Sequence, residues 1–318
     1  MKVKKYTKAM GNYLSDADYR FLINAGFGRY DNMLDREFIK RKFKSCMGRP
    51  LNLDNPQTFN EKLQWLKLYD RKPGYTVMVD KYRVRDYIKE KLGEEYLIPL
   101  LGVWDDPKDI DFEKLPNQFV LKCNHNSGLG MYICKDKSKL TTKSIRTIRR
   151  NLSRGLAQDY YLTGREWPYK DVPRKIIAEK YMTDSDSADG VKDYKFFCFN
   201  GKVGFFKVDF DRFVRHRANY YDPDGNLLPF GEKICPPDFD KTQKIPEKLP
   251  QMIEMAEKLS AGIDFLRVDF YYINGQIYFG EVTFYPASGF GAFVPENWDM
   301  TLGSYIKLTD MNRIGETT

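Results

Sequence analysis

The chain has 318 residues, of which 42% are hydrophobic and 30% are charged, so a mostly disordered chain is excluded and there is enough material for one large domain or for two to three lobes. The formal net charge of +8, from 52 basic and 44 acidic residues, favours an anionic partner such as a nucleotide, an acidic glycan or an anionic membrane surface. Only two histidines occur, which excludes a histidine-rich zinc site.

The same composition bears on where the chain is located and on what it binds. No run of lysine and arginine is long enough to resemble a nucleic-acid-binding tail, so no nucleic-acid partner is expected. No stretch approaches the roughly 18 uncharged apolar residues that a membrane span needs, and no apolar segment follows the basic start, so a secretory signal is not expected. The five cysteines are scattered and never form a C-x-x-C motif, which indicates reduced thiols in a cytosolic protein.

The first 75 residues have a helical pattern. An apolar stripe among basic residues predicts a helix over 35–47. Thr58 followed by Glu61 has the spacing of a capping box, which predicts that a helix begins there and ends before Lys72-Pro73-Gly74. A second helix is expected from about Thr76 to Leu92, with Gly93 as its stop.

From Pro99 onward the pattern changes to strands. The expected elements are strands at 119–121, 131–134 and 175–181, a helix at 142–157, a hairpin of 194–199 and 202–208, a helix at 251–259, and a hairpin of 265–272 and 276–282. Both hairpins have an Asn-Gly turn. The layout is α+β with antiparallel sheets, rather than a repeated βαβ series.

The first segment that carries chemistry is Leu121 to Gly130, a small glycine-containing loop directly after Lys122. Such a loop can place backbone N–H groups against phosphate oxygens while the lysine supplies positive charge. The loop joins two strands, whereas a P-loop or a dinucleotide fingerprint would open a helix. A mobile cover over a nucleotide and an ordinary hairpin turn both fit this pattern.

The second segment is Ile176 to Met182, an apolar strand that ends in Glu179-Lys180. A purine base fits where the backbone groups of a strand end can pair with its edge and apolar side chains cover its faces. A strand that simply runs out into solvent would look the same.

The third segment pairs Arg267-Val268-Asp269 with Glu281-Val282-Thr283 across a hairpin. Two carboxylates on neighbouring strands can share Mg²⁺, which prefers hard oxygen ligands, although a surface ladder of salt bridges is equally compatible. A two-residue turn at Asn274-Gly275 would leave Glu281 facing away from Asp269. The metal hypothesis therefore predicts a bulge or an odd-length loop, and a three-residue loop of 273–275 with a bulge beside it would satisfy that condition.

Together, these segments resemble the ATP-grasp enzymes in their chain order. The stretch Asn55 to Asp70 resembles the signature of one branch, the TupA-like ATP-grasp proteins, as do Asp80-Lys81-Tyr82 and Asp193-Tyr194-Lys195. The resemblance covers nearly the whole chain. That branch occurs in bacterial polysaccharide gene clusters and is often described as glycosyltransferase-like.

The resemblance implies an ATP-grasp fold in which two α+β lobes clamp ATP. It divides the chain into a mainly helical region at 1–77, a first lobe with the phosphate-covering loop at 78–178, and a second lobe with the adenine hinge and the Mg²⁺ site at 179–318. The ATP-binding residues that it implies are Lys81, Lys122, Asn124, His125, Ser127, Gly128, Gly130, Glu179, Lys180, Tyr181, Met182 and Asp193. Lys195 and Arg267 would act in catalysis.

The resemblance assigns the metal to Asp269 and Glu281. The third metal-site residue of ATP-grasp enzymes is usually Asn, and Thr283 stands at that position here, where its hydroxyl is a poorer ligand than an amide oxygen. The implied reaction is ATP-dependent ligation of a carboxylate to an amine through an acyl phosphate. Its cofactors would be ATP and Mg²⁺.

The acceptor is expected to be an acidic glycan or glycan precursor, joined to an amino acid or another amine in bacterial surface polysaccharide assembly. Arg212 and Arg215 lie in an arginine-rich segment that suits a carboxylate clamp, and Ser288 and Gly289 lie in a loop just past Glu281. Three alternatives stay open: a glycosyltransferase of the same pathway, a sugar kinase, and a non-catalytic nucleotide-binding module. A cytoplasmic location, with peripheral contact at the inner membrane face left open, and an undetermined oligomeric state complete these expectations.

Overall fold

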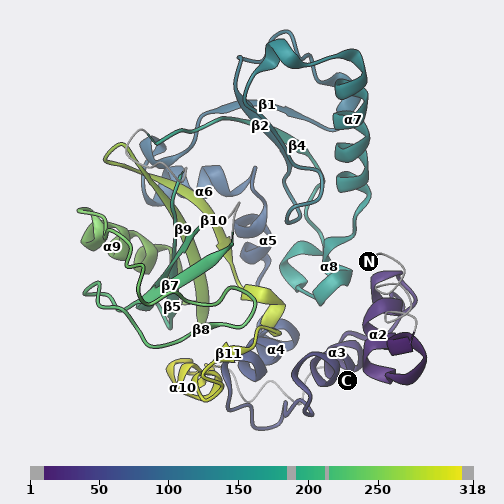
Figure 1. The fold of residues 1–318 in the computed structure, drawn as a ribbon, viewed down its shortest axis with the longest axis vertical. Coiled ribbons are helices and arrows are strands. Elements are labelled where there is room, and N and C mark those ends of the chain that lie inside the picture. The colour runs from purple at the N-terminus through teal and green to yellow at the C-terminus, as the bar shows by residue number, and fades with distance from the viewer. Residues whose placement is uncertain (1–10, 185–190, 212–214, 310–318) are drawn as a thin grey trace.

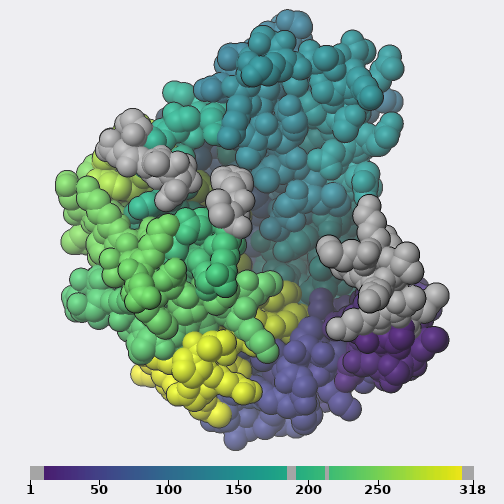
Figure 2. Space-filling model, viewed as in Figure 1, coloured from purple at the N-terminus to yellow at the C-terminus, as the bar shows by residue number. Residues whose placement is uncertain are grey.

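A computed structural model describes residues 11–184, 191–211 and 215–309 (Figure 1). Two antiparallel sheets form separate lobes, and helices from the first third of the chain lie below and beside them. In the space-filling view the teal upper lobe and the green lower lobe are distinct masses, with the purple N-terminal helices at the base (Figure 2). The expected α+β class with antiparallel sheets is confirmed.

The N-terminal part is helical, as its sequence pattern predicts. Its helices are α2 (Ala17–Gly26), α3 (Asp35–Met47), α4 (Phe59–Tyr69), α5 (Pro73–Val79) and α6 (Val84–Lys91). The capping box at the start of α4 is present, because the Thr58 hydroxyl accepts from the backbone N–H of Glu61 while the Glu61 carboxylate accepts from that of Thr58.

The single helix expected over 76–92 is wrong, because the chain breaks between α5 and α6. Asp80 adopts an extended conformation. Its Oδ1 accepts hydrogen bonds from the backbone N–H of Tyr82 at 2.9 Å and from the side chain of Asn124 at 2.7 Å. A tertiary contact with the glycine-containing loop thus competes with helix continuation, and the apolar pattern alone does not reveal it.

The first lobe is a four-stranded sheet in the order β1-β4-β2-β3. Its strands are β1 (Leu100–Trp104), β2 (Phe119–Cys123), β3 (Tyr132–Cys134) and β4 (Ile176–Lys180). Helix α7 (Thr142–Ala157) packs Ile148 and Leu152 against this sheet, and α8 (Tyr160–Gly164) follows it. The boundary expected after residue 178 falls inside β4, which belongs wholly to this sheet.

The second lobe is a five-stranded sheet in the order β10-β9-β5-β6-β7. Its strands are β5 (Asp193–Phe199), β6 (Lys202–Phe210), β7 (Arg217–Tyr221), β9 (Phe265–Ile273) and β10 (Gln276–Thr283). Helix α9 (Leu249–Ser260) covers one face with Met252 and Leu259. The remaining elements are β8 (Gly231–Glu232), β11 (Phe293–Val294), α10 (Trp298–Tyr305) and the short 3-10 helices η1 (Glu94–Tyr96), η2 (Pro107–Asp109), η3 (Lys137–Lys139), η4 (Trp167–Tyr169) and η5 (Pro286–Gly289).

The other face of this second sheet has an apolar half and a polar half. Phe59 of α4 packs against Phe265 and Phe199, with ring centroids 5.0 and 6.3 Å apart, and so joins the N-terminal helices to the apolar half. The polar half carries Lys195 and Asp269 and is the region that matters for function. None of the helices in the described part of the chain combines the length and the hydropathy needed to cross a lipid bilayer.

Candidate active site

A β-bulge places the two carboxylates that were predicted to bind a metal directly opposite each other. In the β9–β10 hairpin, Phe279 pairs with Phe270 and Glu281 pairs with Asp269, so Gly280 is the extra residue. Because strand side chains alternate between faces, this one extra residue brings both carboxylates to the same face. The expected bulge is confirmed.

The position of that bulge differs from the expectation. The turn has two residues, because Ile273 pairs with Gln276, and Asn274 and Gly275 both have positive φ (49° and 77°), as a type I′ turn requires. The expected three-residue loop is therefore wrong. The alternation is shifted further along β10, at Gly280.

Arg267 and Lys195 surround the buried Asp269. Arg267 donates two hydrogen bonds to the carboxylate, Nε to Oδ1 and Nη2 to Oδ2, both at 2.7 Å, and Lys195 Nζ donates to Oδ2 at 2.7 Å. Lys195 also pairs with Asp193. Burial raises the pKa of Asp269, but both cations oppose this shift, and with two cationic donors in contact we take the carboxylate as ionised.

Glu281 is held more loosely and remains accessible. Its side chain is 39% exposed, and its nearest cations are Arg267 at 3.4 Å and Lys81 at 3.7 Å. Burial acts to raise the pKa of this carboxyl, but Lys81, Arg267, Lys195 and Lys122 together outweigh it and lower the pKa to about 2. Glu281 is therefore ionised at neutral pH and available to a ligand.

The first lobe brings its own charges to the same place. Lys122 on β2 forms an ion pair of 2.6 Å with Glu179 on β4, and Arg85 of α6 lies 3.8 Å from the same carboxylate. Lys81, Lys122, Glu179 and Gly280 line one small pocket, so both lobes contribute to it. Lys180 ends β4 with an exposed side chain, and Tyr181 and Met182 follow it.

The glycine-containing loop has a fixed base and an exposed tip. Asn124 is fully buried, and its amide donates to Pro173 O at 2.8 Å as well as to Asp80. The buried His125 ring contacts Gln158 O through Nε2 at 3.0 Å. Ser127 and Gly128 are exposed, whereas Gly130 packs against the backbone of α7. The side chains of Asn124 and His125 anchor the base of the loop. Its exposed tip, at Ser127 and Gly128, is accessible to a ligand.

The structure describes three of the four predicted acceptor residues. Arg212 lies outside the described residues, and Arg215 is exposed just before β7. Ser288 and Gly289 lie in η5, which follows β10 directly. A lysine that the sequence reasoning left without a role determines the shape of that segment.

Lys67 of α4 is fully buried and holds η5 in place. Its ammonium group donates to Ser288 O at 2.7 Å, Gly164 O at 2.8 Å and Gln64 Oε1 at 3.0 Å, which uses all three of its hydrogens. Ala287 and Ser288 both have a left-handed backbone conformation (φ 48° and 55°), which costs a non-glycine residue free energy unless contacts hold it. Lys67 lies within the Asn55–Asp70 stretch that carries the family resemblance. That position was the signal in the sequence by which its role could have been found.

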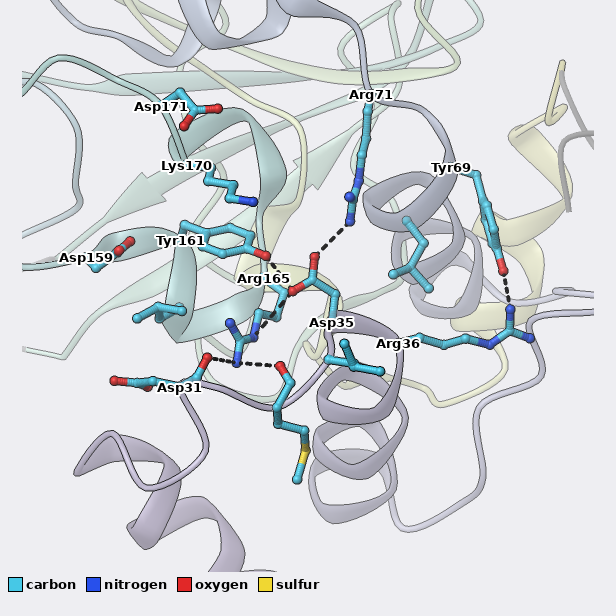
Figure 3. Close-up of a pocket in the computed structure, with 14 residues that line it drawn as sticks. Asp31, Asp35, Arg36, Tyr69, Arg71, Asp159, Tyr161, Arg165, Lys170 and Asp171 are labelled. Atoms are coloured by element: carbon cyan, nitrogen blue, oxygen red, sulfur yellow. Dashed lines mark hydrogen bonds and ion pairs between the residues drawn. The ribbon is translucent and has the colours of Figure 1, made fainter. Parts of the chain in front are cut away.

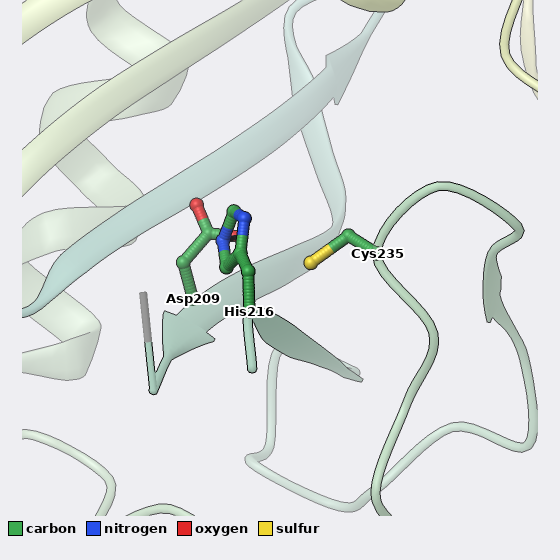
Figure 4. A group of neighbouring side chains, drawn as sticks. All are labelled: Asp209, His216 and Cys235. Atoms are coloured by element: carbon green, nitrogen blue, oxygen red, sulfur yellow. Dashed lines mark ion pairs between the residues drawn. The ribbon is translucent and has the colours of Figure 1, made fainter. Parts of the chain in front are cut away.

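Two further groups were not anticipated from the sequence. Asp209, His216 and Cys235 lie together at the far side of the polar face, with His216 Nε2 3.3 Å from Asp209 (Figure 4). Because Lys207 and Lys195 lie 3.6 and 3.8 Å from the same carboxylate, they compete with any metal ion there.

The second group is an open pocket of about 660 Å³ between the N-terminal helices and α8 (Figure 3). At its centre, Asp35 accepts from Arg71 at 2.9 Å and from Tyr161, and it lies 3.8 Å from Arg165. This pocket mixes acidic and basic side chains, and no segment quoted for the ATP site lines it.

The donor set on the polar face fits Mg²⁺. Asp269, Glu281 and Thr283 all project from one face, with Thr283 opposite Arg267 across the hairpin. Carboxylate and hydroxyl oxygens are hard ligands of the kind that Mg²⁺ takes, and the accessible Glu281 is the best placed of the three. Thr283 is only partly buried, so solvent reaches this position.

Comparison with known protein families finds a match. A family model described as TupA-like ATP-grasp matches residues 61–307. That span includes both lobes, both strands of the β9–β10 hairpin, and Lys67. A search of curated protein sequences found no significant match.

Several solved structures share the outline of the fold at low similarity. D-alanine–D-alanine ligase from Bacillus anthracis has 16% identity and a TM-score of 0.37, covering 65% of this chain and 53% of that one. The Helicobacter pylori enzyme of the same name has 15% identity and a TM-score of 0.41, covering 78% and 69%. The ATP-grasp ligase PsnB has 11% identity and a TM-score of 0.39, covering 81% and 67%. This chain thus spans about half the length of the Bacillus anthracis enzyme, and similarity at this level transfers no substrate.

Proposed function

The chain belongs to the TupA-like ATP-grasp family, and from that premise we propose that it is an ATP-dependent carboxylate–amine ligase. The observation that carries the proposal is the pairing of Asp269 with Glu281 on one face of β9–β10, with Arg267 and Lys195 beside them. These are the charges that phosphoryl transfer to a carboxylate requires.

The first step of the proposed reaction is attack of a substrate carboxylate on the γ-phosphorus of ATP, which gives an acyl phosphate and ADP. Bound at Asp269 and Glu281, Mg²⁺ would neutralise charge on the phosphate oxygens. Lys195 and Arg267 orient the transferring group and stabilise its charge. Both are held in a single geometry by Asp269, so they need little reorganisation when the reaction occurs.

The second step is attack of an amine on the acyl phosphate, with departure of phosphate and formation of an amide. Arg267 would stabilise the oxyanion that forms in this second step. We assign the ATP phosphates to Lys81 and Lys122 and to the exposed loop tip at Ser127 and Gly128. The end of β4, from Glu179 to Met182, would contact adenine, and Asp193 the ribose.

For the substrates we propose a uronic-acid-type carboxylate on a glycan or a glycan precursor, and an amino acid or another amine. The support is the family resemblance, together with the exposed Arg215 and the η5 loop at Ser288 and Gly289, which follows the strand of Glu281 along the chain. Such a ligation belongs to the assembly of a bacterial capsule or surface polysaccharide. The reaction consumes ATP, so we place it in the cytoplasm.

The proposal is tested by a matrix of uronic acids and amino acids incubated with ATP and Mg²⁺. We expect ADP and phosphate release that depends on both partners, and a product whose mass is the sum of the two minus one water. A product that retains a phosphate would indicate a sugar kinase instead. Release of UDP from a sugar nucleotide would indicate a glycosyltransferase, and binding of ATP without any turnover would indicate a non-catalytic module.

A further inference from the structure

Glu166 is a buried carboxylate that the proposed mechanism does not use, and it lies within electrostatic reach of Arg267. It is 5% exposed and stands between α8 and η4. The preceding residue, Arg165, has a left-handed backbone (φ 54°), and its Nη2 donates to Tyr30 O and Asp31 O at 2.8 and 3.0 Å. These bonds anchor the turn from which the Glu166 side chain projects.

This carboxylate lies against the η5 loop. A methyl group placed on Gly164 would lie 3.2 Å from Glu166 Oε1 and would collide with Ser288 Oγ, so the three residues share one small space. Burial raises the pKa of Glu166, and Lys67, the Ser288 hydroxyl, Lys42 and Arg267 oppose that rise. Glu166 therefore faces the loop that was assigned above to the acceptor.

Each of the three cations around Glu166 donates hydrogen bonds to other acceptors. Among the described residues, no ion pair within 4.0 Å involves this carboxylate. Lys67 uses its three hydrogens on oxygen acceptors, Lys42 donates to Thr163 O at 2.5 Å, and Arg267 is bonded to Asp269. A buried carboxylate without a direct counter-ion is costly, and a cationic ligand relieves that cost.

A pair of tyrosines lies close enough to Glu166 to be affected by its charge. Tyr160 and Tyr169 pack edge to face, with ring centroids 4.8 Å apart. Burial raises the pKa of both hydroxyls, and Glu166 and Glu281 each raise it further, so the two rings lie within electrostatic reach of both carboxylates. Aromatic faces beside a carboxylate attract an ammonium group. The charge of Glu166 also raises the pKa of the Tyr285 hydroxyl. Tyr285 is the last of the ionisable groups around Glu166 among the described residues.

The chemistry of ligation requires a group of this kind. An amine enters at neutral pH as an ammonium ion and has no lone pair until it loses a proton. We propose that Glu166 binds the ammonium group of the amine substrate and accepts the proton that the nitrogen must lose before it attacks the acyl phosphate. This inference rests on the proposed function. Lys67 acts as a positioning residue, because it holds the backbone carbonyls of Ser288 and Gly164 beside the carboxylate.

An N–H bond of the ammonium breaks, and its proton moves to a Glu166 oxygen. The freed lone pair forms the C–N bond at the acyl carbon, and the C–O bond to phosphate breaks with its electron pair on the leaving oxygen. The second excess proton on nitrogen leaves with the phosphate, and Glu166 later releases its proton to solvent.

The test compares two amines of different basicity with the Glu166→Gln variant. Glucuronic and galacturonic acids serve as carboxylate probes, with either glycine or hydroxylamine as the amine. Hydroxylamine is a weak base that is largely uncharged at neutral pH, so it needs no proton acceptor and intercepts the acyl phosphate as a hydroxamate. We expect the variant to lose glycine-dependent amide formation by about 100-fold or more at pH 7 and to keep hydroxamate formation within about threefold.

Two further observations sharpen the comparison. The glycine-dependent rate of the variant should rise by about tenfold for each unit of pH, because the free amine then forms in solution. Glu166→Asp should recover part of that rate, and Glu247→Gln, at an exposed position, should match the wild type in both reactions.

The outcomes separate the two proposals. If the wild-type protein forms no acid-dependent hydroxamate, the proposed function fails and this inference fails with it. If hydroxamate forms but Glu166→Gln reduces both products equally, with an unchanged melting temperature, Glu166 serves phosphoryl transfer rather than the amine. If the variant retains both products, Glu166 does not contact the amine.

Discussion

Gly280 determines where the carboxylates of the candidate metal site point. A single inserted residue reverses the alternation of β10 and brings Glu281 opposite Asp269. The position is tight, since a side chain there would begin 3.0 Å from Asp269 O. An extra residue at any of several positions in the hairpin would bring both carboxylates to one face. The need for a bulge was therefore predictable from the sequence, but its position was not.

Removing either carboxylate charge should stop the reaction. We expect Glu281→Gln and Asp269→Asn each to reduce ADP formation by at least about 100-fold, because the amide keeps the shape but not the charge that holds the cation. Glu254→Gln on the exposed face of α9 is the control and should retain full turnover. Full turnover in both site variants would remove the metal assignment. The melting temperature of each variant, measured alongside the activity, separates loss of the cation from loss of the fold.

The pKa of Glu281 also predicts a dependence of stability on pH. Because the folded-state pKa is lowered to about 2 from an ordinary value of 4.5, the ionised carboxylate stabilises the fold above about pH 4.5, and that contribution is lost as the pH falls toward 2. The melting temperature of the wild type should therefore exceed that of Glu281→Gln at pH 7, and the difference should shrink between pH 4.5 and 2. A difference that stays constant over this range would contradict the ion-pair account.

At the scale of elements, α4 connects the N-terminal helices to the site. Its capping box was legible in the sequence, because Thr58 and Glu61 act within one turn. The buried polar face of α4 was not predictable from the sequence, because Gln64 and Lys67 bond to residues of η5 and α8, more than ninety residues away along the chain. A buried lysine looks like an ordinary surface lysine in a helical pattern.

Replacing Lys67 should disturb the loop and the fold together. Lys67→Met removes the donor for Ser288 O and Gly164 O, and leaving buried acceptors unpaired costs about 1–3 kcal/mol each. We expect a lower free energy of unfolding in urea and a raised KM for the carboxylate or the amine, with the KM for ATP unchanged. Lys40→Met on the exposed face of α3 controls for the loss of charge. An unchanged KM for both the carboxylate and the amine would show that η5 keeps its shape without the Lys67 hydrogen bonds.

At the scale of the whole molecule, the site exists only where the two sheets meet. Lys122 and Glu179 come from the first sheet, Asp269 and Glu281 from the second, and Lys81 from the segment between α5 and α6. ATP bound there would contact both lobes, so its affinity reports on their relative placement.

Lys122 provides the test of this arrangement. We expect Lys122→Ala to weaken ATP binding by about 1–3 kcal/mol, the range for a charge-assisted hydrogen bond. Lys175→Ala removes a comparable ion pair, to Asp105 at 2.7 Å, near the start of β4 and should leave the affinity unchanged. Isothermal titration with ATP and Mg²⁺ measures both variants, and equal affinity for all three proteins would exclude Lys122 from the phosphate site.

What the sequence by itself determined is everything that local rules control: the hairpins with Asn-Gly turns, the capped start of α4, the helix over 142–157 and the α+β class. These features depend on residues a few positions apart, so periodicity and turn chemistry reveal them. The break at Asp80, the bulge at Gly280 and the environment of Glu166 were decided by the tertiary structure alone. Each depends on hydrogen bonds or on desolvation by segments distant in the chain, and a linear pattern carries no record of those contacts.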